Sequence, residues 1–305
     1  MALTSIADQP TAPLGATLKN GRDVRLAARA SLWLTPTSGL APGYLQANLL
    51  VLPSRYAADF RLLCQRNPVP CPLVAESSES GSFSSFKSYL PGLSDSAVLN
   101  DIDIRLDIPY YNVYADSTLV KSACPDIASE WTADHVAFLI GCSFSFEGAL
   151  TGAGLTPPHT ALNRNVPMYR TTIPLCPAGV FTNGIYVVSM RSYKLQDIEK
   201  VREITSAYVS THGEPIAWGW QAVAKLGIKD IDAPDFGDAP LTRYGKPLGD
   251  EAGSEDEVPV FWGCGVTPQE AIKTAGLSGI IMAHAPGHML LLDCQDSDVF
   301  RRVQT

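Results

Sequence analysis

Charged side chains are scarce in this chain of 305 residues. They make up 18% of the sequence, against roughly 25% in an average soluble domain. The net charge of -8 has the wrong sign for neutralising phosphate, and no run of lysine and arginine alternates with aromatic residues. We therefore expect no nucleic-acid partner.

Long apolar runs and paired cysteines are missing as well. The longest apolar stretch, VAFLIGC, is far shorter than the roughly 20 residues that cross a bilayer. The seven cysteines form no CxxC pair, and their odd number leaves at least one thiol unpaired. These absences predict no membrane partner, reduced thiols and a cytoplasmic location. A mitochondrial location is less favoured, because Asp23 interrupts the basic residues near the N-terminus.

Apolar residues, in contrast, are plentiful at 46%, enough for a large core. Segments of helical period alternate with short apolar runs, which predicts an α/β fold rather than a helical bundle or a β-sandwich. Low hydrophobicity predicts exposed loops at 76–88 and 243–257. Helices are expected at 54–67, 197–208 and 267–276, and strands at 48–52, 135–142, 185–190, 259–264, 279–284 and 289–293.

The helix at 267–276 has the clearest ends in the sequence. We expect Thr267 to cap it, Pro268 to take its first position and Glu270 to complete a TxxE capping box. Gly276 would then end the helix.

The segment GCSFSFEGAL joins a strand of buried type to a helix. The strand is expected to end at Cys142, with Ser143 or Ser145 as the helix cap and Glu147 in the first turn. Free N–H groups at such a junction would lower the pKa of Cys142 and attract a substrate carboxylate. The alternative is purely structural, since serine caps and buried cysteines are common.

Two further segments carry polar groups at proline and glycine turns. In NRNVPMYRT, Arg170 could hold a carboxylate through two parallel hydrogen bonds, with Asn165 and Tyr169 beside it, or it could equally satisfy loop carbonyls. Asp235 and Asp238 flank a Phe-Gly turn. Paired carboxylates can divide acid and base duties, although aspartate in such turns more often bonds its own backbone.

Two histidines lie close together in the segment HAPGH. Pro286 and Gly287 suit the centre of a type II turn, so His284 and His288 are not expected on one continuous helix. Two imidazoles facing one pocket could act as acid and base, or bind a metal if a carboxylate such as Asp238 joined them.

A third histidine, His212, follows the helix expected at 197–208. A histidine near a helix C-terminus often only complements the helix dipole.

Eight blocks of the chain occur in the order of one known family, between about residue 40 and residue 293. They are APGYLQANLLVLP, CQRNPVPCPL, VAFLIGCSFSFE, RNVPMYRT, VVSMR, PDFGDA, PVFWGCGVTPQ and HAPGHMLLLD. On these blocks the chain resembles the D-glutamate cyclase-like family of hydro-lyases. The resemblance implies a three-layer α/β/α sandwich with a smaller two-layer α/β subdomain and mixed sheets. It also implies conversion of D-glutamate to 5-oxo-D-proline with loss of water.

Within that fold we expect a larger domain at 1–120 plus 235–305 and a smaller one at 121–234. The chain departs from the family pattern HGxPxHxG, because HGEPIAWG keeps His212 but places Ala217 at the second histidine. This change could alter the substrate or remove a proton-transfer group.

A glutamate cyclisation needs a base for the attacking amine, an acid for the leaving hydroxide and an anchor for the carboxylate. We expect His284 and His288 to be the acid and base, tuned by Asp235 or Asp238. Replacing His288 with alanine should then lower turnover at least about a hundredfold. Further catalytic candidates are Cys142, Glu147 and His212. Expected substrate contacts are Arg170, Tyr169, Asn165, Gln46, Asn48, Ser143 and Ser145.

Three functions stay open on the sequence alone. The first is this cyclase, a carbon-oxygen lyase. The second is a hydro-lyase or cyclase that acts on another small amino or carboxylic acid in a specialised pathway. The third is a non-catalytic protein that binds a small acid. No organic cofactor is expected, whereas a divalent metal and a homo-oligomer are both left open.

Overall fold

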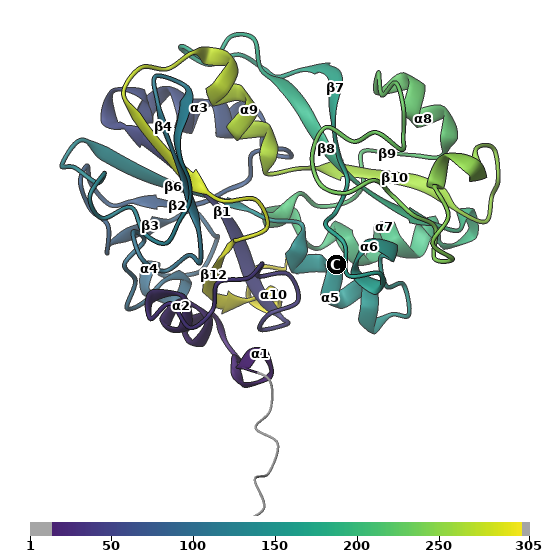
Figure 1. Cartoon of the computed structure of the whole chain (residues 1–305), viewed down its shortest axis with the longest axis horizontal. Helices are drawn as coiled ribbons and strands as arrows, with labels where there is room; N and C mark the ends of the chain where they lie inside the picture. Colours follow the sequence, from purple (N-terminus) through teal and green to yellow (C-terminus); the bar gives the residue numbers. More distant parts are fainter. Residues whose placement is uncertain (1–13, 301–305) are drawn as a thin grey trace, which may run out of the picture.

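Strand β1, Tyr44–Pro53, lies at the centre of the larger of two sheets in the computed structural model, which describes residues 14–300 (Figure 1). The other strands of this sheet are β2 (Leu73–Ser77), β3 (Phe86–Ser88), β4 (Tyr111–Ala115), β5 (Thr118–Cys124), β6 (His135–Gly141), β11 (Ile280–His284) and β12 (Leu290–Gln295). They run in the order β3-β2-β6-β1-β11-β4-β5, and β12 also pairs with β1.

Helices flank both sheets. They are α1 (Leu14–Thr17), α2 (Gly21–Arg29), α3 (Ala57–Arg66), α4 (Asp95–Val98), α5 (Phe144–Gly152), α6 (Pro158–Ala161), α7 (Ile198–Ser206), α8 (Trp220–Lys225), α9 (Val266–Ala275) and α10 (Asp296–Val299). In Figure 1, α3 and α9 lie above the larger sheet, whereas α2 and α4 lie below it.

Strand β1 is buried on both of its faces. Successive side chains of a strand point to opposite faces, so Leu49 and Val51 pack in one core with Val98 of α4. Leu50 and Leu52 pack in a second core, to which α3 and α9 also contribute. The larger sheet therefore forms the middle of three layers, as the sequence led us to expect.

The smaller sheet is built from strands of the second half of the chain. Its strands are β7 (Met168–Pro174), β8 (Ile185–Tyr193), β9 (Ala217–Trp218) and β10 (Val258–Gly263), in the order β7-β8-β10-β9. Val260 and Trp262 pack against α5 and α7, whereas Phe261 packs on the other side with residues of α8. Helices thus lie on both faces of this sheet as well, where the family resemblance implied only two layers.

The chain passes between the two sheets at two similar junctions. Strand β6 of the larger sheet leads through Cys142 and Ser143 into α5, which packs against α7 beside the smaller sheet. Strand β10 of the smaller sheet leads through Cys264 and Gly265 into α9, whose Ile272 belongs to a core of the larger sheet. Both junctions are strand-to-helix turns with a Gly-Cys sequence.

The α/β class predicted from the sequence is confirmed. All six expected strands are present, and the three expected helices correspond to α3 with a preceding 3-10 turn, to α7 and to α9. Both sheets are antiparallel within the described residues, where we expected mixed ones. A continuous apolar run indicates that both faces of a strand are buried. Such burial is compatible with parallel and antiparallel neighbours, so the runs do not predict strand direction.

The expected loop at 76–88 needs correction, and the expected domain boundaries stay untested. The expected loop at 76–88 begins inside β2, where Glu76 is buried and accepts hydrogen bonds from Arg61 and Tyr89. The sheets also cut across the expected domain boundaries, since β6 joins the larger sheet and β10 the smaller one. As a division into folding units, those boundaries stay a prediction. Across residues 14–300, the structure has no helix with the length and apolar character needed to cross a membrane.

The predicted capping box of α9 is wrong. The helix begins at Val266, and the Thr267 hydroxyl bonds strand β8 instead of capping the helix. It accepts from the Val187 N–H at 2.9 Å and donates to the Val187 carbonyl at 3.1 Å. Glu270 pairs with Arg170 rather than with the helix end. Thr267 therefore fastens α9 to β8.

Replacing Thr267 with valine should lower the free energy of unfolding by about 1–3 kcal/mol, because two buried backbone groups of Val187 lose their partner. Urea unfolding measures the change. Thr274→Val on the exposed side of the same helix is the matched control, and we expect a much smaller effect there. Equal effects of the two substitutions would contradict the assigned role of Thr267.

Candidate functional site

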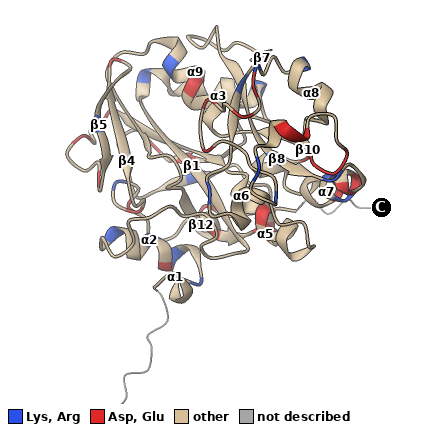
Figure 2. Ribbon diagram, turned by 45° about the vertical axis from the view of Figure 1, so that its right-hand side comes forward, with Lys and Arg blue, Asp and Glu red and all other residues tan. Residues whose placement is uncertain are grey.

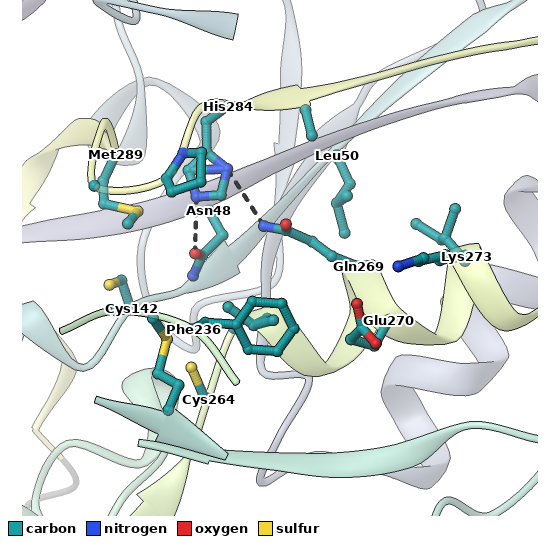
Figure 3. Close-up of a pocket in the computed structure, with 18 of the residues that line it drawn as sticks. Asn48, Leu50, Cys142, Phe236, Cys264, Gln269, Glu270, Lys273, His284 and Met289 are labelled. Atoms are coloured by element: carbon teal, nitrogen blue, oxygen red, sulfur yellow. Dashed lines mark hydrogen bonds between the residues drawn. The ribbon is translucent and has the colours of Figure 1, made fainter. Parts of the chain in front are cut away.

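A cavity of about 530 Å³ lies where both junctions meet the larger sheet. Its walls come from β1, β11, the two Gly-Cys junctions and one face of α9 (Figure 3). The polar side chains Asn48, Gln269 and His284 gather at one end, and Lys273 lies at the other end (Figure 3). We call the end with His284 the inner end of the cavity.

His284 is held in one tautomer by Asn48. The Asn48 amide nitrogen donates to the carbonyls of Ile140 and Gly141, at 3.2 and 3.3 Å, which turns its oxygen toward the imidazole. That oxygen can only accept, so Nε2 of His284, 3.0 Å away, carries the proton. The other ring nitrogen, Nδ1, is then an acceptor and lies 3.4 Å from the amide nitrogen of Gln269.

Burial keeps His284 neutral. Burial, with a smaller contribution from the nearby His288, lowers the pKa of the imidazole to about 3. The side chain therefore presents an unprotonated Nδ1 at neutral pH. A neutral imidazole within reach of a substrate can take up a proton during a reaction.

Gly265 leaves the room that Asn48 occupies. A Cβ atom on this glycine would lie 2.0 Å from the Asn48 amide nitrogen. The absence of a side chain at the start of α9 thus allows Asn48 to pack against the backbone, and through it fixes the position of His284.

The Gly-Cys junctions bring two helix N-termini to the cavity. Cys142 and Phe144 line it at the start of α5, and Cys264 and Val266 line it at the start of α9. The positive end of a helix dipole attracts a carboxylate. The sequence predicted a carboxylate-binding segment after Cys142. The segment after Cys264 has the same geometry and was not predicted.

The expected low pKa of Cys142 is wrong. Burial raises the pKa of this thiol to about 12, which outweighs the hydrogen bond that its sulfur accepts from the Phe144 N–H. Burial likewise raises the pKa of Cys264 to about 11. Both are protonated thiols at neutral pH rather than activated nucleophiles.

Glu147 and Ser143 belong to a buried ionic cluster centred on Arg191. The Arg191 side chain is fully buried and donates to Glu147 at 2.5 Å and to Ser143 at 3.0 Å. His159 lies 3.2 Å from the same Glu147 oxygen. Burial raises the pKa of Glu147, but His159 and Arg191 outweigh this effect and hold it at about 2. Glu147 is thus an ionised partner of Arg191, and it does not line the cavity.

The turn predicted at HAPGH is confirmed, but its two histidines have different surroundings. The His288 N–H donates to the Ala285 carbonyl, and Gly287 has a φ of 82°, as a type II turn requires. His284 lines the cavity. His288 does not, and its Nδ1 bonds the Pro286 carbonyl at 2.9 Å while its ring packs edge-on to Tyr110.

The Arg170 guanidinium is occupied by protein carboxylates. It bonds Asp235 and Glu270, each at 2.7 Å, and lies over the Phe236 ring. Arg170 and Asp235 do not line the cavity, so the expected carboxylate clamp is not presented to it. Tyr169 is buried, and its hydroxyl donates to the Ile231 carbonyl.

The remaining expected residues divide between the cavity wall and the surrounding structure. Asn165 lines the cavity, and its backbone N–H donates to Asp238. Gln46 bonds Thr37, and Ser145 accepts from the Gln46 N–H, both away from the cavity. Their roles in catalysis or binding stay predictions.

His212 is buried outside the cavity with an unusual backbone. Its φ is +88°, its Nδ1 donates to the Val69 carbonyl at 2.8 Å, and its Nε2 has no partner among the described residues. Burial lowers its pKa to about 4. Ala217, at the position where the family pattern has a histidine, lies in β9 opposite Phe261 and also outside the cavity wall.

The residues of the cavity wall that were not predicted from the sequence include Cys264, Gln269 and Lys273. Gln269 and Lys273 are four apart in α9 and therefore lie on one face of the helix. Lys273 is the one lysine or arginine on the wall within residues 14–300. Charged positions are otherwise found mainly on helices and loops (Figure 2).

The proposed metal trio is not assembled. Of His284, His288 and Asp238, only His284 lines the cavity. Across the part of the chain that the structure describes, no three His, Cys, Asp or Glu side chains are grouped as a metal ion requires.

Comparison with known proteins places the chain in a family. The family model "D-glutamate cyclase" matches residues 136–293. A protein of Schizosaccharomyces pombe is 45% identical over 89% of this chain and 83% of its own length. The chain belongs to the D-glutamate cyclase family. A Bordetella petrii relative is 46% identical over 90% of this chain and 93% of its own, and a Rubrobacter xylanophilus relative is 44% identical over 86% and 91%. All three relatives carry the name "Putative hydro-lyase".

Buried histidines make the stability of this family member depend on pH. The pKa values of His284 and His212 lie below the ordinary 6.5, so the unfolded chain binds more protons between pH 6.5 and about 4. The contribution of these two histidines to the free energy of unfolding is therefore fully present above pH 6.5. It is lost as the pH falls, by about 1.4 kcal/mol per pH unit for each histidine.

Urea unfolding of His284→Gln and His212→Gln between pH 6.5 and pH 5 checks this dependence. Each substitution should remove about 1.4 kcal/mol per pH unit from the slope, whatever it does to stability at neutral pH. An unchanged slope in both variants would mean that the imidazoles are not held neutral by burial.

Proposed function

We propose that this chain removes water from a small amino or carboxylic acid held in the cavity, with conversion of D-glutamate to 5-oxo-D-proline as the leading reaction. The observation that carries the proposal is the unprotonated Nδ1 of His284 at the inner end of a cavity flanked by two helix N-termini. Membership of the D-glutamate cyclase family supports the same reaction class.

In this proposal a single imidazole moves the proton. The substrate reacts with its amine neutral and its γ-carboxyl group protonated, which together carry the same number of protons as the ammonium carboxylate form. The amine attacks the γ-carboxyl carbon and forms the C–N bond, and Nδ1 of His284 takes the proton that the nitrogen loses. The same Nδ1–H then protonates the hydroxyl group on that carbon, so that the C–O bond breaks, water leaves, the other oxygen forms the lactam carbonyl and the imidazole is neutral again. Asn48 keeps its hydrogen bond to Nε2 throughout and stabilises the imidazolium between the two steps.

The carboxylate is held by backbone dipoles in this proposal. The first turns of α5 and α9 carry partial positive charge at residues 142–144 and 264–266. Gln269 donates toward the reacting carboxyl group, where charge develops on oxygen. Lys273, at the outer end, raises the local concentration of acids.

His284→Gln should lower kcat for 5-oxoproline formation at least about a hundredfold, the lower range for a general acid or base. His288→Gln is the contrast. In place of the hundredfold loss expected from the sequence, we expect a change of less than about tenfold, because His288 does not line the cavity and its Nδ1 is bonded to Pro286. Proton NMR of D-glutamate and product measures both rates. A large loss in His288→Gln with a small one in His284→Gln would reverse the assignment.

Gly265→Ala should lower kcat by about a hundredfold, although it adds only a methyl group. The new Cβ would displace the Asn48 amide, and His284 would lose the partner that orients it. Gly148→Ala in α5 is the matched control, because nothing lies within 4 Å of its Cβ position. Unchanged turnover in Gly265→Ala would show that the Asn48 contact is dispensable.

The alternative functions predict different outcomes for the same NMR experiment. A panel of small amino and hydroxy acids separates them. Loss of water from another acid, but not from D-glutamate, would favour a hydro-lyase or cyclase of different specificity. Shifted ligand signals without turnover would favour a binding protein.

A further inference from the structure

The cavity is longer than a five-carbon acid. Val266, Gln269 and Lys273 of α9 all line it, and a rise of about 1.5 Å per residue places the first and last of them about 10 Å apart along the helix. Four C–C bonds in an extended chain cover about 5 Å. The volume of about 530 Å³ lies in the range that accommodates drug-sized ligands.

Beyond Gln269 the wall combines apolar side chains with two charged ones, Lys273 and Glu270, and the Glu270 carboxylate is paired with Arg170. The apolar side chains include Leu50 of β1, Ile272 of α9 and Ile281 of β11, and each of them is buried. Figure 3 shows Leu50 on the side of Gln269 that faces Lys273, away from Cys142 and Cys264. Water beside these apolar side chains makes few hydrogen bonds, so an apolar group that displaces it gains free energy.

The opening carries an exposed leucine on a hairpin. Leu119 of β5 lines the cavity although 48% of its surface is exposed. Tyr114 of β4 lines the cavity from the same hairpin. Val120 is similarly exposed, but it points to the opposite face of β5 and does not line the cavity. An apolar side chain is thus directed at the opening while its neighbour is not.

We propose that the preferred substrate is an acid with an apolar extension of about four carbons, which lies along Leu50, Ile272 and Ile281 and reaches Leu119. The inference rests on the proposed function for the reacting end, since the carboxylate is taken to lie beside the two helix N-termini. D-glutamate fills the inner end only, and a longer acid gains contacts in the outer part.

Straight-chain carboxylates test the extension independently of any reaction. Butanoate, hexanoate and octanoate are titrated into the full chain by calorimetry. Burial of each added methylene should tighten binding about threefold to fourfold, or about a hundredfold from butanoate to octanoate. An affinity that changes less than about threefold over the whole series would overturn the proposal.

Two neighbouring substitutions separate the cavity from the surface. Leu119→Asn should weaken octanoate binding at least about fivefold and leave butanoate binding unchanged, because only the longer chain reaches the opening. Val120→Asn, on the other face of the same strand, should leave both unchanged. Equal effects of the two substitutions would mean that octanoate binds the exposed hairpin outside the cavity, and the proposal would fall. Both positions are exposed, and thermal unfolding verifies that each variant is folded.

The failure of this inference can be told apart from the failure of the proposed function. Turnover of D-glutamate with a flat chain-length series would overturn only the apolar extension. A rising series without formation of 5-oxoproline would overturn only the leading reaction. Competition of octanoate with D-glutamate places the two ligands in one cavity, and binding without competition would contradict the proposal.

Discussion

The structure around the cavity depends on one buried amide in the central strand. Asn48 of β1 is buried, with only 3% of its surface exposed, so the hydrogen-bonding groups of its side chain need protein partners. Its nitrogen bonds the end of β6, its oxygen bonds His284 of β11, and its flank rests on the first residues of α9. Three elements from distant parts of the chain are therefore placed by a single side chain.

Among residues 14–300, no lysine or arginine side chain lies at the inner end. Arg191 and Arg170 are both consumed by protein carboxylates, one in a buried cluster and the other beside Phe236. In the proposed function, a substrate anion at the inner end would have helix N-termini and amides as its partners. Such dipoles are fixed by the backbone and cannot swing away, and they hold an anion without the desolvation cost of a buried cation.

The sequence predicted the frame of the molecule better than its contacts. Continuous apolar runs located six strands because burial on both faces leaves a direct mark on composition. The Pro-Gly turn before His288 was equally legible, since only glycine adopts its φ of 82° at little cost. Asn48 and His284 were recognised because polar residues inside such runs must have partners.

The sequence did not predict which residues Thr267 and Arg170 bond. Thr267 has the pattern of a helix cap, yet its hydroxyl bonds Val187, which lies 80 positions earlier. Arg170 has the sequence context of a carboxylate-binding residue, yet its guanidinium bonds Glu270 of α9, which lies 100 positions later. The pKa of Cys142 depends on how much burial opposes the helix end, and no local sequence pattern measures burial at a junction.

The hairpin of β4 and β5 lies at the edge of the larger sheet, whereas Asn48 and His284 lie near its centre. The reacting groups of the proposed function come from β1, β11 and α9, where a substitution disturbs packing on several sides. Leu119 comes from the last strand of the sheet, which has a neighbour on one side only. Changes in the length or composition of an edge hairpin are tolerated far more readily than changes in a core. Selection could therefore retune which acids enter this enzyme without rebuilding its reaction centre.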